Sequence, residues 1–137
     1  MKILFRELNS VDKITSIKEL SSLLSENRLL KEKQDFLRLI YEREKQGNTL
    51  IAPRIAMPHA EGISVRKTSM AIGKSTKLIN WNNNQFVEMI LLVAINPADE
   101  INNEKLIRII RELGKEEKTV HLIDSTKTNI LRELQKI

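Results

Sequence analysis

The sequence predicts an α/β fold, a three-layer sandwich in which a mixed β-sheet carries helices on both faces. Three observations predict it. Two amphipathic helical patterns occupy residues 14–45, short β-like runs lie between residues 50 and 95, and helical patterns fill most of the remaining chain. The chain has 137 residues, 41% of them hydrophobic, which suits one domain with one core. We therefore expect a single domain over residues 1–137.

The first third of the chain carries the two helical patterns. Residues 14–26 place leucines and isoleucines at helical spacing, and Asp12 or Ser10 can cap this helix. A second pattern runs from about residue 31 to residue 45, and Gly47 follows where a left-handed C-terminal residue is wanted. Two helices are therefore expected ahead of the sheet residues.

Three β-like runs follow, at residues 50–57, 68–72 and 86–95. The third run is apolar without alternation over most of its length, which indicates a strand covered on both faces. The polar stretch at residues 81–85 predicts the turn that leads into it. These runs are expected to form the sheet.

Helical spacing returns after Asn96 and Pro97. The apolar positions of this helix end at Gly114, and a last helix begins at Ser125 or Thr126. The four glycines are scattered along the chain, so a glycine-rich loop that cradles phosphate has no support.

The charge pattern bears on the class of partner. The formal net charge is +5, but basic residues alternate with acidic ones and aromatic residues make up only 4% of the chain, so direct nucleic-acid binding is not expected. Between residues 54 and 77, five basic residues accompany a single acidic one. We expect an electropositive surface there, which either suits an anionic substrate group or an acidic partner, or is simply a basic surface.

Other classes of protein are excluded by what the sequence lacks. Without cysteine there is no disulfide or thiolate chemistry, and two distant histidines give no local metal-ligand spacing, so neither a metal nor a cofactor is expected. No apolar stretch approaches the ~18 residues that cross a bilayer, and the N-terminal residues become charged too soon for a secretory signal. We expect a cytoplasmic protein without membrane insertion.

His59 is the first candidate for chemistry. It follows Pro58 at the end of an apolar run, and Pro58 pushes Met57 to extended geometry, so we expect His59 at a strand-to-loop junction. Because histidine titrates near neutral pH, a neutral and nucleophilic ring nitrogen is available. The same context also suits a structural histidine, and the local sequence leaves both interpretations open.

A wider set of residues resembles a known family. The set comprises the pattern Arg43-Glu44-x-x-Gly47-x-Thr49, the hexapeptide Ile55-Ala56-Met57-Pro58-His59-Ala60, and Ile79-x-Trp81 followed by the apolar strand to Ile95. In order and spacing these motifs resemble the fructose/mannitol-type enzyme IIA domain of the bacterial phosphoenolpyruvate-dependent sugar phosphotransferase system. The resemblance spans essentially the whole chain.

The resemblance implies a phosphohistidine carrier. His59 would accept a phosphoryl group from the phosphocarrier protein HPr and pass it to the IIB component of a sugar permease. Arg43 would bind the phosphoryl oxygens through its planar guanidinium, and Thr49 would add a hydroxyl hydrogen bond. Without the family pattern, Arg43 reads as a helix-end residue paired with Glu42 or Glu44.

Two departures from the family pattern stand out. Many members carry a second histidine at the position of Lys105, which could donate to a phosphoryl oxygen or simply be solvated. Arg54 replaces a small residue ahead of the hexapeptide. HPr presents a basic face in this system, so the excess positive charge of this chain disfavours rapid docking of the two proteins.

These departures keep two alternatives open. Modules resembling enzyme IIA also occur within sugar-responsive transcription regulators, where phosphorylation of His59 would act as a switch by adding roughly −1.5 to −2 charge. A pure interaction module with an inert His59 is the third possibility. Packing explains four further residues better than chemistry, so we expect them to be structural: His121, Trp81, Met57 and Met70.

Overall fold

The computed structural model describes residues 1–10 and 12–137. The elements follow one another as β1 (Lys2–Glu7), α1 (Lys13–Glu26), α2 (Lys33–Gln46), β2 (Leu50–Ala52), β3 (Arg54–Ala56), β4 (His59–Glu61), β5 (Ser69–Asn82), β6 (Gln85–Ile95), α3 (Glu100–Leu113), α4 (Glu116–Ile123) and α5 (Lys127–Lys136). Among these described residues, no helix is long and apolar enough to cross a membrane.

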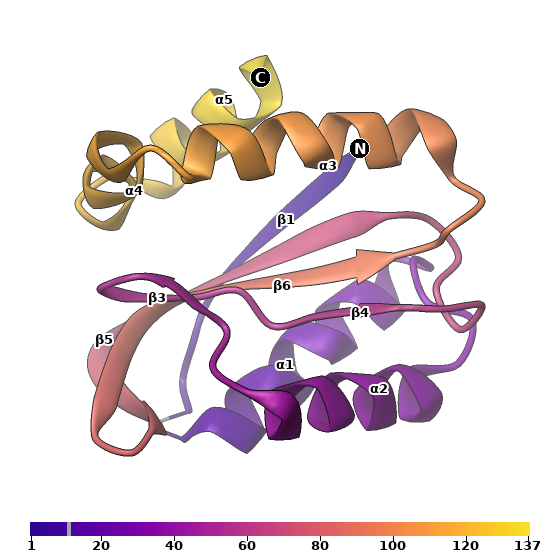
Figure 1. Cartoon of the computed structure of the whole chain (residues 1–137), viewed down its shortest axis with the longest axis horizontal. Helices are drawn as coiled ribbons and strands as arrows, with labels where there is room; N and C mark the ends of the chain where they lie inside the picture. The colour runs from indigo at the N-terminus through magenta and orange to yellow at the C-terminus, as the bar shows by residue number, and fades with distance from the viewer. Residues whose placement is uncertain (11) are drawn as a thin grey trace.

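The strands form one mixed sheet of six strands. Its order is β1-β5-β6-β3-β2, and β4 also pairs with β6. The pairs β1–β5, β3–β6 and β4–β6 are parallel, whereas β5–β6 and β2–β3 are antiparallel. Helices α1 and α2 cover one face of the sheet and α3, α4 and α5 cover the other (Figure 1). The predicted three-layer α/β sandwich is confirmed.

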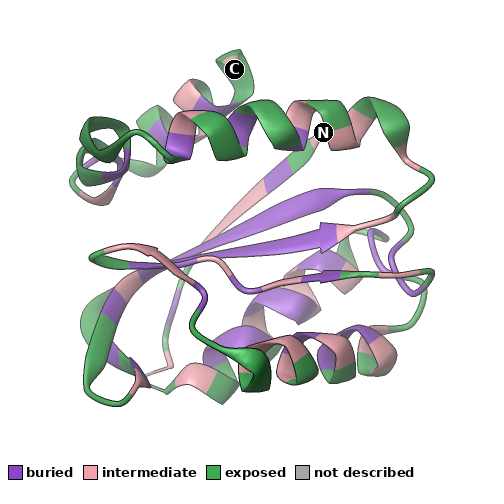
Figure 2. Ribbon diagram, viewed as in Figure 1, coloured by how far each residue is buried: buried purple, intermediate pink, exposed green. Residues whose placement is uncertain are grey.

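The sheet separates two hydrophobic clusters. One contains Leu20, Phe36 and Ile40 from α1 and α2, and the other contains Ile109 and Leu134 from α3 and α5. Side chains of β5 and β6 alternate between the two clusters, and both strands are purple over most of their length in Figure 2. The prediction that the apolar part of this run is covered on both faces is confirmed for residues 89–94, whereas Phe86 at its beginning is exposed.

Helix ends agree with the expected capping chemistry. Asp12 caps α1 by accepting a hydrogen bond from the Thr15 backbone N–H, and Thr126 caps α5 by accepting from that of Asn129. Gly47 follows α2 with φ of 153° and ψ of 178°. This conformation is extended and open to glycine rather than left-handed helical, so the expectation was right about the residue and wrong about its exact geometry.

Several predicted strands have different limits. The run at residues 50–57 divides into β2 and β3, because the chain reverses at Pro53 and Arg54, where Arg54 has φ of 70°. The short run at residues 68–72 is only the beginning of β5, and the turn into β6 is confined to Asn83 and Asn84. Both asparagines have positive φ, as a tight hairpin requires.

Two elements were not predicted. Strand β1 was missed because its six residues carry charges at Lys2, Arg6 and Glu7, although it fills the parallel edge position beside β5. Helix α4 has weak local signals, since Lys115 precedes it without a side-chain capping bond.

Candidate functional site

The site lies where one strand beside β6 ends and another begins. Strand β3 pairs with β6 as far as Ala56 and Ile90, and β4 resumes with His59 opposite Val93. Pro58 stands in the gap because it has no N–H for the ladder, and its carbonyl accepts a hydrogen bond from the Val93 N–H (2.9 Å). His59 therefore begins a strand, which corrects the predicted strand-to-loop junction to a loop-to-strand junction.

The imidazole of His59 is half-buried and fixed through one nitrogen. Nδ1 lies 3.0 Å from the carbonyl oxygen of Met57. Because a carbonyl oxygen can only accept, Nδ1 must carry the hydrogen of this bond, and in the neutral ring Nε2 then carries the free lone pair. The local backbone thereby selects which nitrogen can act as a nucleophile.

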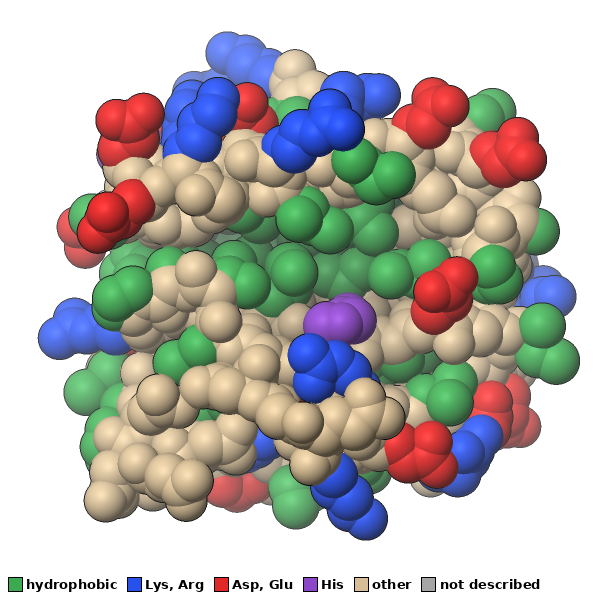
Figure 3. All heavy atoms as spheres, in the orientation of Figure 1, with side chains coloured by type: hydrophobic (Ala, Val, Ile, Leu, Met, Phe, Trp, Pro, Cys, Tyr) green, Lys and Arg blue, Asp and Glu red, His purple; other side chains and the backbone are tan. Residues whose placement is uncertain are grey.

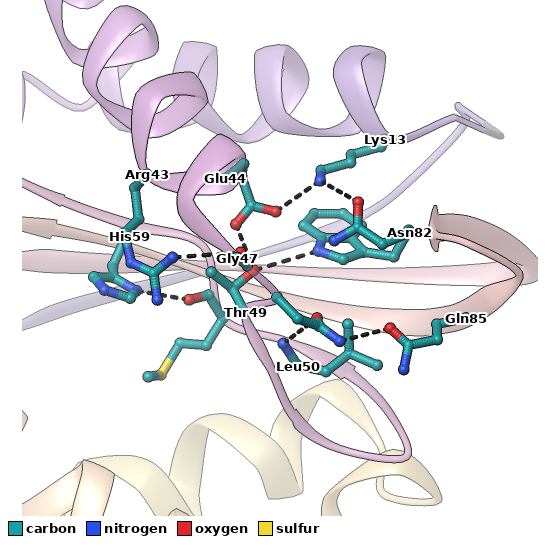
Figure 4. Close-up of polar contacts among 12 residues, drawn as sticks. Lys13, Arg43, Glu44, Gly47, Thr49, Leu50, His59, Asn82 and Gln85 are labelled. Atoms are coloured by element: carbon teal, nitrogen blue, oxygen red, sulfur yellow. Dashed lines mark hydrogen bonds and ion pairs between the residues drawn. The ribbon is translucent and has the colours of Figure 1, made fainter.

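Arg43 occupies the last turn of α2, beside His59. Figure 4 shows its guanidinium next to the imidazole, and Figure 3 shows a basic side chain directly against the histidine ring. Within the described residues, Arg43 donates a long hydrogen bond from Nη1 to the Gly47 carbonyl (3.4 Å). The alternative pairings are not formed, because Glu42 binds Arg38 and Glu44 binds Lys13.

Thr49 lies behind this pair and is 5% exposed. Its hydroxyl donates to Oε2 of Glu44 (2.5 Å) and accepts from Nε1 of Trp81 (3.3 Å). A threonine hydroxyl has a single hydrogen to donate, and here it is directed to Glu44. The structure thus places the Thr49 hydroxyl toward the interior.

Glu44 and Lys13 complete a polar network that the sequence did not predict (Figure 4). The Glu44 side chain is 6% exposed, and its Oε1 lies 2.8 Å from Nζ of Lys13. The same Nζ donates to Oδ1 of Asn82 (3.2 Å) and lies 4.8 Å from the ring centre of Trp81. The one feature of the sequence that could have predicted this network is the position of Glu44 within the Arg43–Thr49 pattern. A carboxylate at a helix end is ordinarily expected to be exposed to solvent, so that feature was not used.

Lys105 lies on α3 and is directed to the end of α5. Its Nζ donates to the main-chain oxygens of Gln135 (2.7 Å) and Ile137 (2.6 Å). Burial, followed by the nearby charge of Arg108, lowers the pKa of this amine. Among the described residues, no hydrogen bond links Lys105 with His59, and the Lys105 amine is bound to the end of α5 instead.

An apolar groove borders the histidine. It has a volume of about 250 Å³ and runs between the β2–β4 segment and the end of α3; its lining consists of Ile51, Met57, Ile110, Leu113 and Gly114. Figure 3 shows hydrophobic side chains gathered in the hollow beneath α3, with the imidazole at its edge. Met57 belongs to both features, since its side chain lines the groove and its carbonyl binds His59.

Charged groups of both signs lie around the site. Arg54 is paired with Glu88 (3.6 Å), and Glu61 follows His59 by two positions on β4, which puts both residues on the same face of the strand. Figure 3 shows hydrophobic and acidic groups near the ring and one basic group against it. The groups next to the ring on this face are therefore of both charges.

His121 is remote from this arrangement. It lies on α4, is exposed, and its Nε2 is 3.1 Å from Oε1 of Glu133 on α5. Trp81 and Met70 are buried, as the sequence indicated, whereas His121 is exposed instead of packed.

Known proteins share both the sequence pattern and the fold. The sequence model of the family described as "Phosphoenolpyruvate-dependent sugar phosphotransferase system, EIIA 2" matches residues 2–137. The chain belongs to this family.

Three similar proteins illustrate the relationship. The fructose-specific EIIABC component of Mycoplasma pneumoniae is 32% identical over 93 residues, which cover 66% of this chain and 13% of that protein. This chain therefore spans a small part of that relative's length. Nitrogen regulatory protein IIA-Ntr from Neisseria meningitidis has a TM-score of 0.72 at 19% identity, covering 96% of this chain and 90% of the other. The Escherichia coli complex of enzyme IIAMTL with phosphorylated enzyme IIBMTL gives 0.70 at 15%, covering 99% and 95%.

Proposed function

We propose that this chain carries a phosphoryl group on Nε2 of His59, accepting it from phosphorylated HPr and passing it to a IIB component. The observation that carries the proposal is the hydrogen bond from Nδ1 to the Met57 carbonyl, because it leaves the Nε2 lone pair for attack on phosphorus. As the new N–P bond forms, the N–P bond of the donor histidine breaks and its electron pair returns to the donor ring. The Nδ1 hydrogen of His59 stays in place, so the step requires no proton transfer by this chain.

Arg43 is the group that we propose for the transferring phosphoryl oxygens. In phosphoryl transfer, negative charge is spread over three equatorial oxygens, and a planar guanidinium can donate to two of them at once. The 3.4 Å bond to Gly47 is long for a hydrogen bond, so exchanging it for a charged oxygen is favourable.

The groove beside the histidine is the surface that we propose for the protein donor and acceptor. An apolar floor with a charged rim is typical of protein–protein contacts. Glu61, which is exposed and lies two positions after His59 on β4, also offers an acidic group to the basic face expected of HPr, which eases the conflict raised by the net charge of the chain. The Escherichia coli complex with phosphorylated IIBMTL supports a IIB partner.

A regulatory role is the second candidate, and the placement of Lys105 favours it. There is no second imidazole at the position of Lys105, and the Thr49 hydroxyl donates to Glu44, so Arg43 is the group that we expect to bind the phosphoryl oxygens. A phosphoryl group that enters and leaves slowly suits a switch better than a carrier.

The first experiment is phosphoryl labelling. The protein is incubated with phosphoenolpyruvate, enzyme I and HPr, and an acid-labile, base-stable phosphate is expected on the wild type and absent from His59→Ala. His121→Ala is the matched control, since it removes the other imidazole and should label normally. An unlabelled wild type would refute both the carrier and the switch.

The second experiment separates the two candidates. Candidate IIB proteins are added to the labelled protein, and transfer onward is followed over time. A carrier loses its label to a IIB protein rapidly, whereas a switch retains most of it.

A further inference from the structure

We propose that Thr49 is a positioning residue for His59, fastened by a buried Glu44–Lys13 pair, and that it does not bind phosphate itself. The inference rests on the proposed function of His59. It assigns to Thr49, Glu44 and Lys13 one shared task, which is to present the Nε2 lone pair.

The first step of the argument is the donor count at Thr49. The hydroxyl hydrogen goes to Glu44, and the hydroxyl oxygen also receives the indole N–H of Trp81. Donating to a phosphoryl oxygen would require breaking the bond to a carboxylate that is 6% exposed. Leaving a buried carboxylate without its donor is costly, so the hydroxyl stays with Glu44.

The second step is the path from Thr49 to the imidazole. The backbone carbonyl of Thr49 accepts a hydrogen bond from the Met57 N–H (2.8 Å), and the Met57 carbonyl accepts from Nδ1 of His59 (3.0 Å). Two successive hydrogen bonds therefore join the Thr49 main chain to the ring. Any shift of Thr49 moves the acceptor that selects the tautomer.

The third step is the anchorage of Thr49. Glu44 belongs to α2, Lys13 begins α1, and Trp81 and Asn82 end β5, so the network joins three elements at a single point. Arg43 precedes Glu44 in the same helical turn and bonds to Gly47 in the loop before Thr49. The same anchorage therefore sets both the guanidinium and the imidazole.

The chemical consequence concerns the neutral ring. Free histidine in water favours the tautomer with hydrogen on Nε2, which presents an N–H rather than a lone pair to an incoming phosphorus. The Met57 carbonyl reverses this preference only while it stays within hydrogen-bond reach of Nδ1. Loosening Thr49 should release the ring toward the unreactive tautomer.

The test compares three threonine variants. Thr49→Val removes the hydroxyl at nearly constant shape, and Thr49→Ser retains it. Thr119→Val is the control, because it removes another buried threonine hydroxyl, which donates to the main-chain carbonyl of Glu116 on the remote helix α4. The ring nitrogens of His59 are observed by nitrogen-15 NMR at alkaline pH. We expect hydrogen on Nδ1 in the wild type, Thr49→Ser and Thr119→Val, and a mixture of tautomers in Thr49→Val.

Phosphorylation by HPr is then measured on the same proteins. Thr49→Val should be slowed roughly 10- to 100-fold, as small misplacements of reacting groups are, and Thr49→Ser should recover most of the rate. If Thr49→Val reacts more slowly but keeps the wild-type tautomer of His59, the inference is overturned, because that result indicates that the Thr49 hydroxyl binds phosphate. An unchanged rate in a folded Thr49→Val would overturn it as well.

Two provisions keep the outcomes distinct. If Thr49→Val does not fold, Thr49→Ala removes the hydroxyl without placing a methyl group against Glu44, and the same results are expected of it. The tautomer measurement needs no phosphoryl donor. A wild type that never labels therefore refutes the proposed function alone, whereas an unshifted tautomer in the variant refutes the positioning role alone.

Discussion

The two sides of His59 differ in what holds them together. On the α2 side, the Glu44–Lys13 pair and hydrogen bonds to buried groups fasten Thr49, and Arg43 bonds to the Gly47 carbonyl beside it. On the α3 side, an apolar groove remains open between Met57 and Ile110, which is 40% exposed. The difference separates two tasks, because chemistry needs fixed groups whereas protein partners need an accessible surface that excludes water.

The largest expected effect comes from the polar side, at Arg43. Arg43→Ala should slow phosphorylation of His59 by roughly 100- to 1,000-fold, as the loss of one oxyanion donor does elsewhere. Arg43→Lys keeps the charge without the planar fork and should recover only part of the rate. Rapid-quench labelling by phosphorylated HPr measures both.

Arg38→Ala is the matched control for this change. Arg38 lies on the same helix but is exposed, and it pairs with Asp35 and Glu42. If Arg38→Ala and Arg43→Ala slow the reaction equally, the effect belongs to general charge, and the role assigned to Arg43 is wrong.

The next effect comes from the apolar side, at Ile110. Ile110→Asp places a charge in the groove and should raise the KM for phosphorylated HPr about tenfold with little change in kcat, since a central interface contact is worth about 1–2 kcal/mol. Steady-state labelling at several HPr concentrations measures the two constants separately.

Val120→Asp controls for an added charge on an exposed apolar residue. Val120 is exposed on α4 and does not line the groove. A similar rise in KM for Val120→Asp, or a fall in kcat alone for Ile110→Asp, would contradict docking at this groove.

The comparison also explains which features the sequence could predict. Local rules narrowed each helix cap to two candidates, of which the structure uses Asp12 and Thr126, and they were sufficient for the covered strand β6, because each feature depends on nearby residues. The division of the run at residues 50–57 also has a local cause, since Pro53 lies within it. The local sequence made His59 a candidate, and the resemblance to the family favoured it and supplied Arg43. The structure brings these two residues together.

The remaining features depend on tertiary packing. The direction of the Lys105 side chain is set by α5, which ends about thirty residues further along the chain. Glu44 lies at a helix end where solvent is the usual surrounding, and only the approach of Lys13 and Thr49 makes it an interior group. Neither the α5 partner of Lys105 nor the Lys13 partner of Glu44 can be identified from residues adjacent in sequence.

The smallest expected effect concerns the beginning of α3, the helix whose other end lines the apolar groove. Asp99 caps this helix, and its carboxylate accepts from the Asn102 side chain and from the Thr68 backbone N–H (2.9 Å). Burial acts to raise the pKa of Asp99, but these hydrogen bonds outweigh it and hold that pKa below the ordinary value of 3.8. Asp99→Ala should lower the free energy of unfolding by about 1 kcal/mol at neutral pH, as the loss of a capping residue does.

The pH dependence of that loss follows from the sign of the pKa shift. A carboxyl whose pKa is lower in the folded protein stabilises it above the unfolded-state pKa, and this contribution disappears as pH falls through the folded-state value. The difference between wild type and Asp99→Ala should therefore shrink below about pH 4. Urea unfolding across this range measures it, with Asp124→Ala as the control at an exposed carboxylate beyond α4. A difference that stays constant from neutral pH to acid would show that Asp99 acts through its shape rather than through its charged hydrogen bonds.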